Sequence, residues 1–163
     1  MDIVLYNTMV KEKQVFLPIQ RDHVRLYACG PTVYDRIHVG NARPLVVFDV
    51  LVRLLRAAFP KVTYVRNITD VDDKINARAA ERSIPISELC EQTIFSFHKD
   101  CKALNVLPPD IEPRATEHIA QMIAMITGLI EKGFAYEAEG HVLFSIEKMP
   151  DYGQLSGRSL DEM

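Results

Sequence analysis

The sequence lacks the features that would place it in a membrane, secreted or zinc-finger class. No run of about 18 apolar residues could span a bilayer, and the first residues, MDIVLYNTMVKEK, have neither the basic start nor the apolar middle of a signal peptide. The three cysteines are odd in number and have no CxxC spacing, which excludes a disulfide framework and a closed zinc finger. Repeats and low-complexity segments are also lacking. We therefore expect a soluble, cytoplasmic protein with reduced thiols.

The length of the chain and its distribution of charge limit the number of domains and the kind of substrate to expect. A chain of 163 residues that is 48% hydrophobic can bury an ordinary core, so we expect one domain with an appended lobe. Residues 21–66 hold eight Arg/Lys and three Asp, a net charge of +5, whereas residues 67–163 hold nine Arg/Lys and seventeen Asp/Glu, a net charge of −8. A local positive field suits a phosphate-bearing substrate, but a solvated Arg-rich helix face accounts for it as well.

The first half of the chain has the pattern of a strand, a helix and a second strand. HVRLYACG alternates apolar and polar residues up to Cys29, and NARPLVVFDVLVRLLRAAF has apolar residues at helical spacing with Pro44 in its first turn. KVTYVRNIT, rich in β-branched residues, is the second strand. A βαβ unit of this kind has parallel strands whose carboxyl ends share one edge, where ligands bind, so Gly30 and Thr69 are expected there.

The second half has mainly helical patterns. We expect helices in PISELCEQTIFSFHKDCKAL and in EPRATEHIAQMIAMITGLIEKG, where an apolar stripe ends at Lys132 and Gly133. FAYEAEGHVLFSI then predicts a hairpin that turns at Glu139 and Gly140. In ITDVDDKI, a helix N-terminus capped by Thr69 or Asp70 explains the acidic residues more simply than a metal site does.

The loop CGPTVYDRIHVGNAR carries the candidate chemistry. His38, Gly40 and Asn41 stand where a loop enters a helix, so free backbone N–H groups would face an anion there. Gly40 would let the anion approach closely, and the two side chains would add donors. On spacing alone, a surface histidine and an asparagine helix cap are the favoured interpretation.

Four stretches, CGPTVYDRIHVGNAR, YVRNITDVDDKI, PPDIEPRATEHI and YGQLS, resemble the cysteinyl-tRNA synthetases, a class I aminoacyl-tRNA synthetase family. The HIGH motif of that family falls on residues 38–41, with an asparagine in place of its second histidine. The resemblance implies that His38 and Asn41 are catalytic and that Gly30 and Thr69 bind cysteine. It implies further that ATP, with Mg²⁺, is bound by Pro31, Thr32, His38, Gly40 and Asn41.

The resemblance also assigns Cys29 to a metal site. In the family this position is the first ligand of a Zn²⁺ ion that binds the substrate side chain, and zinc prefers a thiolate to the hydroxyl of serine. Without the resemblance, we would interpret Cys29 as a small, buried hydrophobic residue. His98 and Cys101 lie three residues apart on one predicted helix but have no third ligand nearby, so we expect them, like His23, His118 and His141, to be structural.

The resemblance implies an α/β fold with two parts. Residues 1–69 would be the first half of a Rossmann-type catalytic fold, and residues 70–163 a helical connective-peptide region with a small hairpin. The other zinc ligands, the KMSKS loop and the anticodon-binding region do not occur in this sequence, so we expect the chain alone to be inactive. The full-length enzyme would be a monomer that uses cysteine, ATP and tRNA(Cys) and no membrane.

Two other functions stay open at this point. The cysteine ligase of mycothiol biosynthesis has the same motifs but transfers cysteine to an amino-sugar. A non-catalytic binding module could retain the structure alone.

Overall fold

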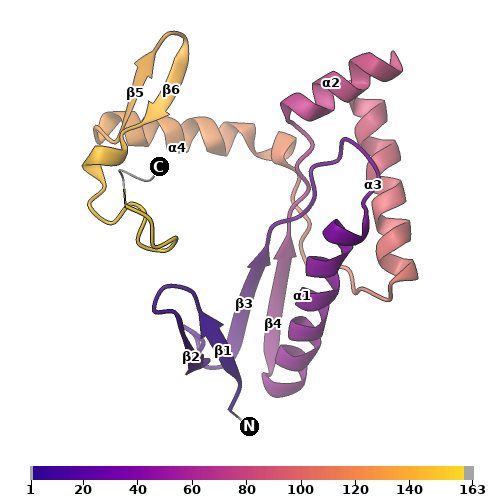
Figure 1. The fold of residues 1–163 in the computed structure, drawn as a ribbon, viewed down its shortest axis with the longest axis vertical. Helices are drawn as coiled ribbons and strands as arrows, with labels where there is room; N and C mark the ends of the chain where they lie inside the picture. The colour runs from indigo at the N-terminus through magenta and orange to yellow at the C-terminus, as the bar shows by residue number, and fades with distance from the viewer. Residues whose placement is uncertain (1, 160–163) are drawn as a thin grey trace. The chain divides into compact units, whose positions relative to one another are not determined.

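The computed structural model describes residues 2–159, which form two compact units. One unit is Pro18–His118, and the other joins the N-terminal residues up to Leu17 to the residues from Ile119 onward. Figure 1 shows the elements of each unit. No helix in the described part of the chain is long and apolar enough to cross a membrane.

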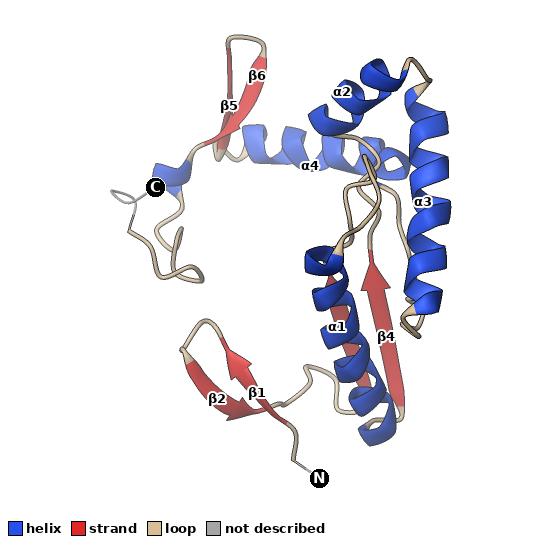
Figure 2. Ribbon diagram, turned by 45° about the vertical axis from the view of Figure 1, so that its right-hand side comes forward, coloured by secondary structure: helices blue, strands red, loops and turns tan. Residues whose placement is uncertain are grey.

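The unit Pro18–His118 is built on the expected βαβ arrangement. Strands β3 (His23–Ala28) and β4 (Lys61–Arg66) pair in parallel, with Ala28 opposite Arg66, and α1 (Val39–Ala58) connects them. Figure 2 shows α1 lying along these strands. Buried apolar side chains alternate along β3 and recur at helical spacing in α1, and these are Val24, Ala28, Leu45, Val52 and Leu55. The prediction of a parallel strand–helix–strand unit is confirmed.

Helix α1 begins earlier than expected, which changes the place of Pro44. The helix starts at Val39 with His38 as its N-cap, so Pro44 lies in its second turn rather than its first. Its ring has no N–H to donate, and the helix continues without interruption to Ala58.

An irregular segment extends the sheet beyond β4. The Asp110 N–H donates to the Tyr64 carbonyl oxygen, and the Arg66 N–H donates to the Ile111 carbonyl oxygen. Residues 112–114, which we expected to begin a helix, are not helical: the Ile68 N–H donates to the Pro113 carbonyl oxygen, and Arg114 forms a parallel bridge with Ile68. A 3₁₀ turn, η1 (Ala115–His118), precedes α4 (Ile119–Glu131). The helical pattern was overridden because pairing with β4 satisfies the backbone of this segment.

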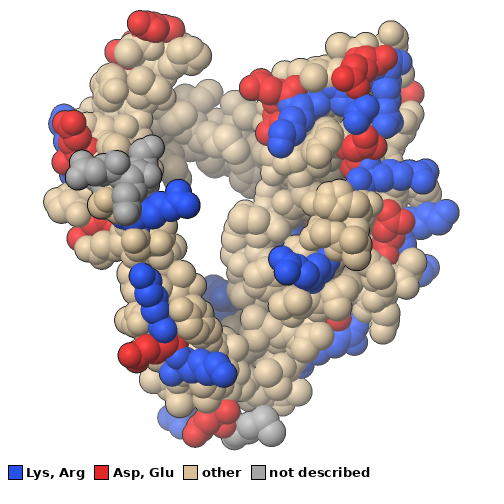
Figure 3. Space-filling view, in the orientation of Figure 1, with Lys and Arg blue, Asp and Glu red and all other residues tan. Residues whose placement is uncertain are grey.

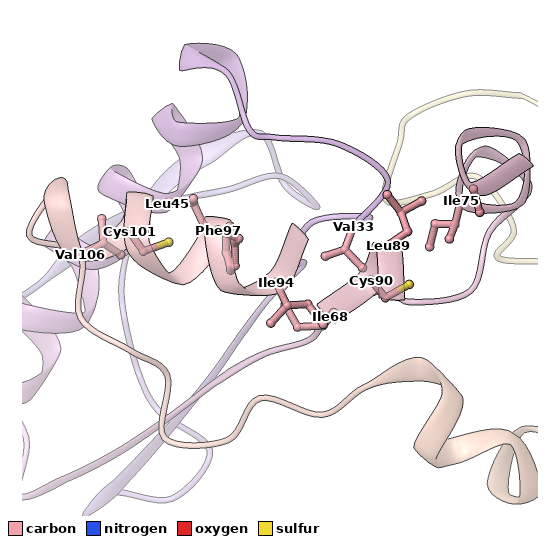
Figure 4. Packing of buried hydrophobic residues seen from close by; sticks show 11 residues of the cluster. Val33, Leu45, Ile68, Ile75, Leu89, Cys90, Ile94, Phe97, Cys101 and Val106 are labelled. Carbon is pink, nitrogen blue, oxygen red and sulfur yellow. The ribbon is translucent and has the colours of Figure 1, made fainter. Parts of the chain in front are cut away.

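Two further helices cover the carboxyl end of the βαβ unit. They are α2 (Asp73–Arg82) and α3 (Ile86–Ala103). Apolar side chains of α3 lie along the centre of the core, as Figure 4 shows, and the cluster consists of Val33, Leu45, Ile68, Ile75, Ala79, Leu89, Cys90, Ile94, Phe97, Cys101 and Val106. Both helices belong to the same compact unit as the strands. The division between compact units therefore does not fall at residues 69 and 70, and the connective-peptide region stays a prediction.

The other unit contains two hairpins and α4. Strands β5 (Ala135–Ala138) and β6 (His141–Phe144) pair antiparallel around Glu139 and Gly140, both with positive φ, so the predicted turn is confirmed. A 3₁₀ turn, η2 (Ile146–Lys148), follows. The hairpin of β1 (Val4–Asn7) and β2 (Glu12–Val15) was not predicted. The expected cap of α4 is present, because Gly133 has φ of 75° and the Gly133 N–H donates to the Ile130 carbonyl oxygen.

The apolar stripe of α4 is not buried by the described residues. All its members have at least a third of their surface accessible, and they are Ile119, Met122, Ile123, Ile126 and Ile130. The helical spacing thus predicted the helix correctly. The burial of one helix face, which an apolar stripe usually indicates, is not found among the described residues.

One buried carboxylate ties α1 to the segment that follows α3. Asp49 is 8% exposed; its Oδ2 accepts from Arg53 Nε at 2.7 Å and its Oδ1 accepts from the Leu107 N–H at 2.8 Å. Both carboxylate oxygens therefore have partners, and the Leu107 N–H depends on one of them.

We expect Asp49→Ala to lower the free energy of unfolding by about 1–3 kcal/mol, because the Leu107 N–H loses its acceptor. Asp49→Asn keeps that acceptor, so its loss should be smaller. Urea unfolding followed by circular dichroism measures both, with the exposed Asp22→Ala as the control, expected within about 0.5 kcal/mol of the parent. Equal stability of Asp49→Ala and Asp22→Ala would contradict this role.

Candidate active site at the carboxyl end of the parallel strands

A pocket of about 140 Å³ opens where β3 and β4 end and α1 begins. Its wall contains five of the residues that the sequence singled out, namely Cys29, Gly30, Pro31, Gly40 and Asn41. The remaining lining residues are Ala28, Ile37, Pro44, Leu45, Phe48, Tyr64, Arg66 and Phe97. The predicted residues Thr32, His38 and Thr69 do not line it, although Thr32 and Thr69 are paired by a parallel bridge beside it. Residues from both strand ends and from the helix start therefore meet at one place.

The start of α1 is closed by a reciprocal capping box. The Gly40 N–H donates to His38 Nδ1 at 3.0 Å, and the His38 N–H donates to Asn41 Oδ1 at 3.2 Å. Since Nδ1 accepts a hydrogen bond, the ring hydrogen is on Nε2. Since Oδ1 of Asn41 also accepts, its amide NH₂ remains available. The cap thus uses the acceptor atoms His38 Nδ1 and Asn41 Oδ1. The N–H donors of the same two side chains take no part in it.

The expectation of free backbone N–H groups at this helix start is wrong for two positions. The Gly40 N–H is bound to His38 Nδ1, and the Asn41 N–H donates to the His38 carbonyl oxygen at 2.9 Å. A Cβ on Gly40 would lie 2.8 Å from His38 Cε1, so the glycine makes room for the imidazole. At these two positions, side-chain N–H groups of His38 and Asn41 are available to a ligand in place of the backbone N–H groups.

Asn67 connects the ends of the two strands. Its Oδ1 accepts from the Gly30 N–H and from the Tyr27 hydroxyl, both at 2.9 Å, and its Nδ2 donates to Thr69 Oγ1 at 3.1 Å. A Cβ on Gly30 would lie 1.5 Å from the Asn67 carbonyl oxygen, a distance that no side chain can occupy. Gly30 is therefore required by the close approach of the two chains.

The floor of the pocket carries a buried cation. Arg66 is 1% exposed; its Nη2 donates to Glu112 Oε1 at 3.1 Å, and its guanidinium carbon lies 5.1 Å from the Phe97 ring centroid. Its Nε and Nη1 are buried and have no hydrogen-bond partner among the described residues. Burial raises the pKa of the neighbouring Tyr64 phenol, which keeps it neutral.

The comparisons with known proteins identify the family of this chain. Residues 15–163 match the family model "tRNA synthetases class I (C) catalytic domain". The chain belongs to the class I tRNA synthetase catalytic-domain family. It is 63% identical over 163 residues to the cysteine–tRNA ligase of Rhodospirillum rubrum and 65% identical to that of Paramagnetospirillum magneticum. In each case all of this chain is covered, and it spans about 36% of the relative's length.

A solved tRNA synthetase shares the fold. The methionyl-tRNA synthetase of Mycobacterium tuberculosis, solved with methionyl-adenylate, superposes with a TM-score of 0.61 at 21% identity, over 69% of this chain and 23% of that one. The likeness supports a mixed α/β synthetase fold.

Cys29 is the exposed thiol of this synthetase chain, whereas Cys90 and Cys101 are buried in the core. Zinc sites in proteins use three or four protein ligands. The described residues contain no group of three or more His, Cys, Asp or Glu side chains that could hold a metal ion. The residues present therefore do not complete a zinc site, and Cys29 supplies a single thiol.

The other candidate ligands of this synthetase chain have structural partners. Asp72, not Thr69 or Asp70, caps α2, because its Oδ1 accepts from the Lys74 N–H at 2.8 Å. Asp70 instead accepts from the Thr116 N–H and hydroxyl. The ring nitrogens of three histidines also have partners within the protein, in the pairs His98–Glu112, His118–Arg114 and His23–Thr63.

Three arginines of the first half of the chain, Arg53, Arg56 and Arg66, bind carboxylates of the same compact unit. Arg53 pairs with Asp49, and Arg56 pairs with Asp110. Figure 3 shows Lys/Arg and Asp/Glu side chains interspersed on the surface. Residues 18–118 hold 14 Lys/Arg and 13 Asp/Glu, a net charge of +1, so the compact unit as a whole carries little of the positive excess of residues 21–66.

Sequence reasoning missed Asn67, Arg66 and Asp49. Asp49 had a visible signal, since it is a charged residue on the apolar stripe of α1 between Leu45 and Val52. Arg66, at the end of a buried strand, had a weaker one. Nothing in the spacing distinguishes Asn67, because its importance comes from the pairing of β3 with β4.

We expect one fast-reacting thiol per folded chain, that of Cys29. Burial raises the pKa of the Cys90 and Cys101 thiols, so at neutral pH few of them are thiolates, and the reagent cannot reach them. A disulfide-exchange reagent followed by absorbance measures the reaction. Denaturant should expose all three thiols, and Cys29→Ser should abolish the fast phase; two fast thiols in the native protein would contradict this assignment.

Proposed function

We propose that this chain is the first part of the catalytic domain of a cysteine–tRNA ligase. The full-length enzyme joins cysteine to ATP, giving cysteinyl-adenylate and pyrophosphate, and then transfers cysteine to tRNA(Cys). The observation that carries the proposal is that Cys29, Gly40 and Asn41 line one pocket, so a thiol lies beside a helix start that presents donors. Identity of 63–65% to two cysteine–tRNA ligases supports it.

The β3–α1–β4 unit is the first half of a Rossmann-type fold in this proposal. Parallel strands joined by a helix place their loops at one edge of the sheet, where such folds bind nucleotides. Pro31 and Thr32, which follow β3, belong to the ATP site together with the helix start. The resemblance assigns them, and their position between Gly30 and the capping box supports that assignment.

The donors left by the capping box act on the phosphates. His38 Nε2–H and the Asn41 amide donate to phosphate oxygens of ATP, which is bound as its Mg²⁺ complex. A carboxylate oxygen of cysteine attacks the α-phosphorus, and the bond from that phosphorus to the pyrophosphate oxygen breaks. Donors that are already oriented stabilise the charge that develops on those oxygens. Because the cap fixes both side chains before ATP binds, they need little reorganisation in the transition state.

We expect His38→Ala in the full-length enzyme to lower kcat for cysteine-dependent ATP–pyrophosphate exchange by about 10²–10³-fold, with KM for cysteine within about twofold. His38→Ser is the matched variant, because serine restores the N-cap but not the ring donor. Both variants should lose exchange, while only His38→Ala should lose about 1 kcal/mol of stability. Exchange within twofold of the parent in either variant would rule out this role of His38.

Cys29 is proposed as one ligand of a zinc ion, and no step of the reaction is derived through that ion. A zinc-bound thiolate would distinguish cysteine from serine by the softness of sulfur. The described residues supply only this one ligand, so the remaining ligands would have to come from outside them.

We expect the 163-residue chain, purified without added metal, to hold well under one zinc per chain, because a single thiolate binds the ion weakly. The full-length enzyme should hold about one and lose it on Cys29→Ala. Elemental analysis of the purified proteins measures this. Chelator-resistant, stoichiometric zinc in the 163-residue chain would show that another set of its residues forms a site, and a zinc-free full-length enzyme would remove the proposed basis of selectivity.

A further inference from the structure

We infer that Asn67 is a positioning residue that turns the Thr69 hydroxyl into a hydrogen-bond donor for the carboxylate of the amino-acid substrate. The inference deepens the proposed function and rests on it, because the cysteine–tRNA ligase resemblance makes Thr69 a cysteine-binding residue. It concerns a residue between the end of β4 and Thr69 that no motif singled out.

The orientation of the Asn67 amide follows from its neighbours. A backbone N–H can only donate, and the Gly30 N–H lies 2.9 Å from Oδ1 of Asn67. The Tyr27 hydroxyl donates to the same oxygen. The NH₂ group must therefore be on the opposite side of the amide, where it lies 3.1 Å from Thr69 Oγ1. A flipped amide would place two donors against the Gly30 N–H.

The orientation of Asn67 determines what Thr69 can do. A hydroxyl has one hydrogen and two lone pairs, and one lone pair of Thr69 Oγ1 accepts from Asn67 Nδ2. No other described residue makes a side-chain hydrogen bond with Thr69, so its hydrogen is available to a ligand. A carboxylate is the acceptor that gains most from such a donor, because the bond is charge-assisted.

The backbone around Thr69 holds the hydroxyl in place. The Thr69 N–H donates to the Pro31 carbonyl oxygen at 3.0 Å, and the Val33 N–H donates to the Thr69 carbonyl oxygen at 3.1 Å. Thr69 is thus fixed to the loop that leads from Cys29 to the cap of α1. That loop joins the residue proposed for the substrate thiol to the residues proposed for the phosphates, so a donor anchored to it can orient the carboxylate that reacts there.

The test is Asn67→Asp in the full-length enzyme. An aspartate keeps the acceptor for the Gly30 N–H and the Tyr27 hydroxyl but replaces the NH₂ group with an oxygen. The Thr69 hydroxyl would then donate to that oxygen and no longer to the substrate. KM for cysteine in pyrophosphate exchange should rise about tenfold or more, while KM for ATP stays within about twofold. The surface variant Asn76→Asp, which makes the same chemical change on α2, should alter neither constant.

Two further measurements separate this role from charge repulsion and from misfolding. In a Thr69→Val background, Asn67→Asp should raise KM for cysteine by less than about threefold, because the hydroxyl is already gone and only repulsion remains. Cysteamine, which lacks the carboxylate, should inhibit the parent and Asn67→Asp with equal constants. A misfolded variant would instead have less active enzyme, which lowers kcat and leaves KM unchanged.

The possible outcomes separate the positioning role of Asn67 from the proposed function. Unchanged KM for cysteine in Asn67→Asp, or an equal rise with and without the Thr69 hydroxyl, would overturn the positioning role while leaving the proposed function intact. Absence of cysteine-dependent exchange in the parent enzyme would overturn the proposed function and the inference together.

Discussion

The parallel pairing of β3 with β4 is the constraint on which the site depends. The register places Ala28 opposite Arg66, so the residues that follow each strand leave the sheet at one edge. There Gly30 approaches the Asn67 carbonyl oxygen so closely that any Cβ would clash. The hydrogen bond of Asn67 to Gly30 is formed at this contact, and Cys29 and Gly30 line the pocket beside it. A one-residue slip of the pairing would separate these groups and turn the buried residues of β4 to the open face.

The parts of the fold that were predictable from sequence are those with a local pattern. The alternation in HVRLYACG, the helical stripe of α1 and the Glu139–Gly140 turn each specify an element from neighbouring residues. The helical pattern expected for residues 112–114 was overridden, because this segment bonds to Ile68, just after β4 and far away in the sequence. The stripe of α4 predicted a helix correctly but could not reveal that the described residues leave it accessible.

The candidate site also contains residues that could be predicted from the sequence and residues that could not. The motif around His38 and the position of Cys29 were visible in the sequence, since residue type and spacing carry the resemblance. The occupied N–H of Gly40 was not, because a histidine that caps its own helix is a matter of rotamer and backbone angle. Asn67 and Arg66 matter through contacts with residues distant in the sequence, so no spacing marks them.

The capping box also limits which side chains can occupy position 41. That side chain accepts from the His38 N–H, and in the proposed function it must also carry a hydrogen for the phosphate. Asparagine meets both demands with its two amide ends, and histidine meets them with its two ring nitrogens. Aspartate accepts but has no hydrogen to offer, and lysine donates but cannot accept. Asparagine and histidine are therefore interchangeable here for a stereochemical reason, although one is a neutral amide and the other a titratable ring.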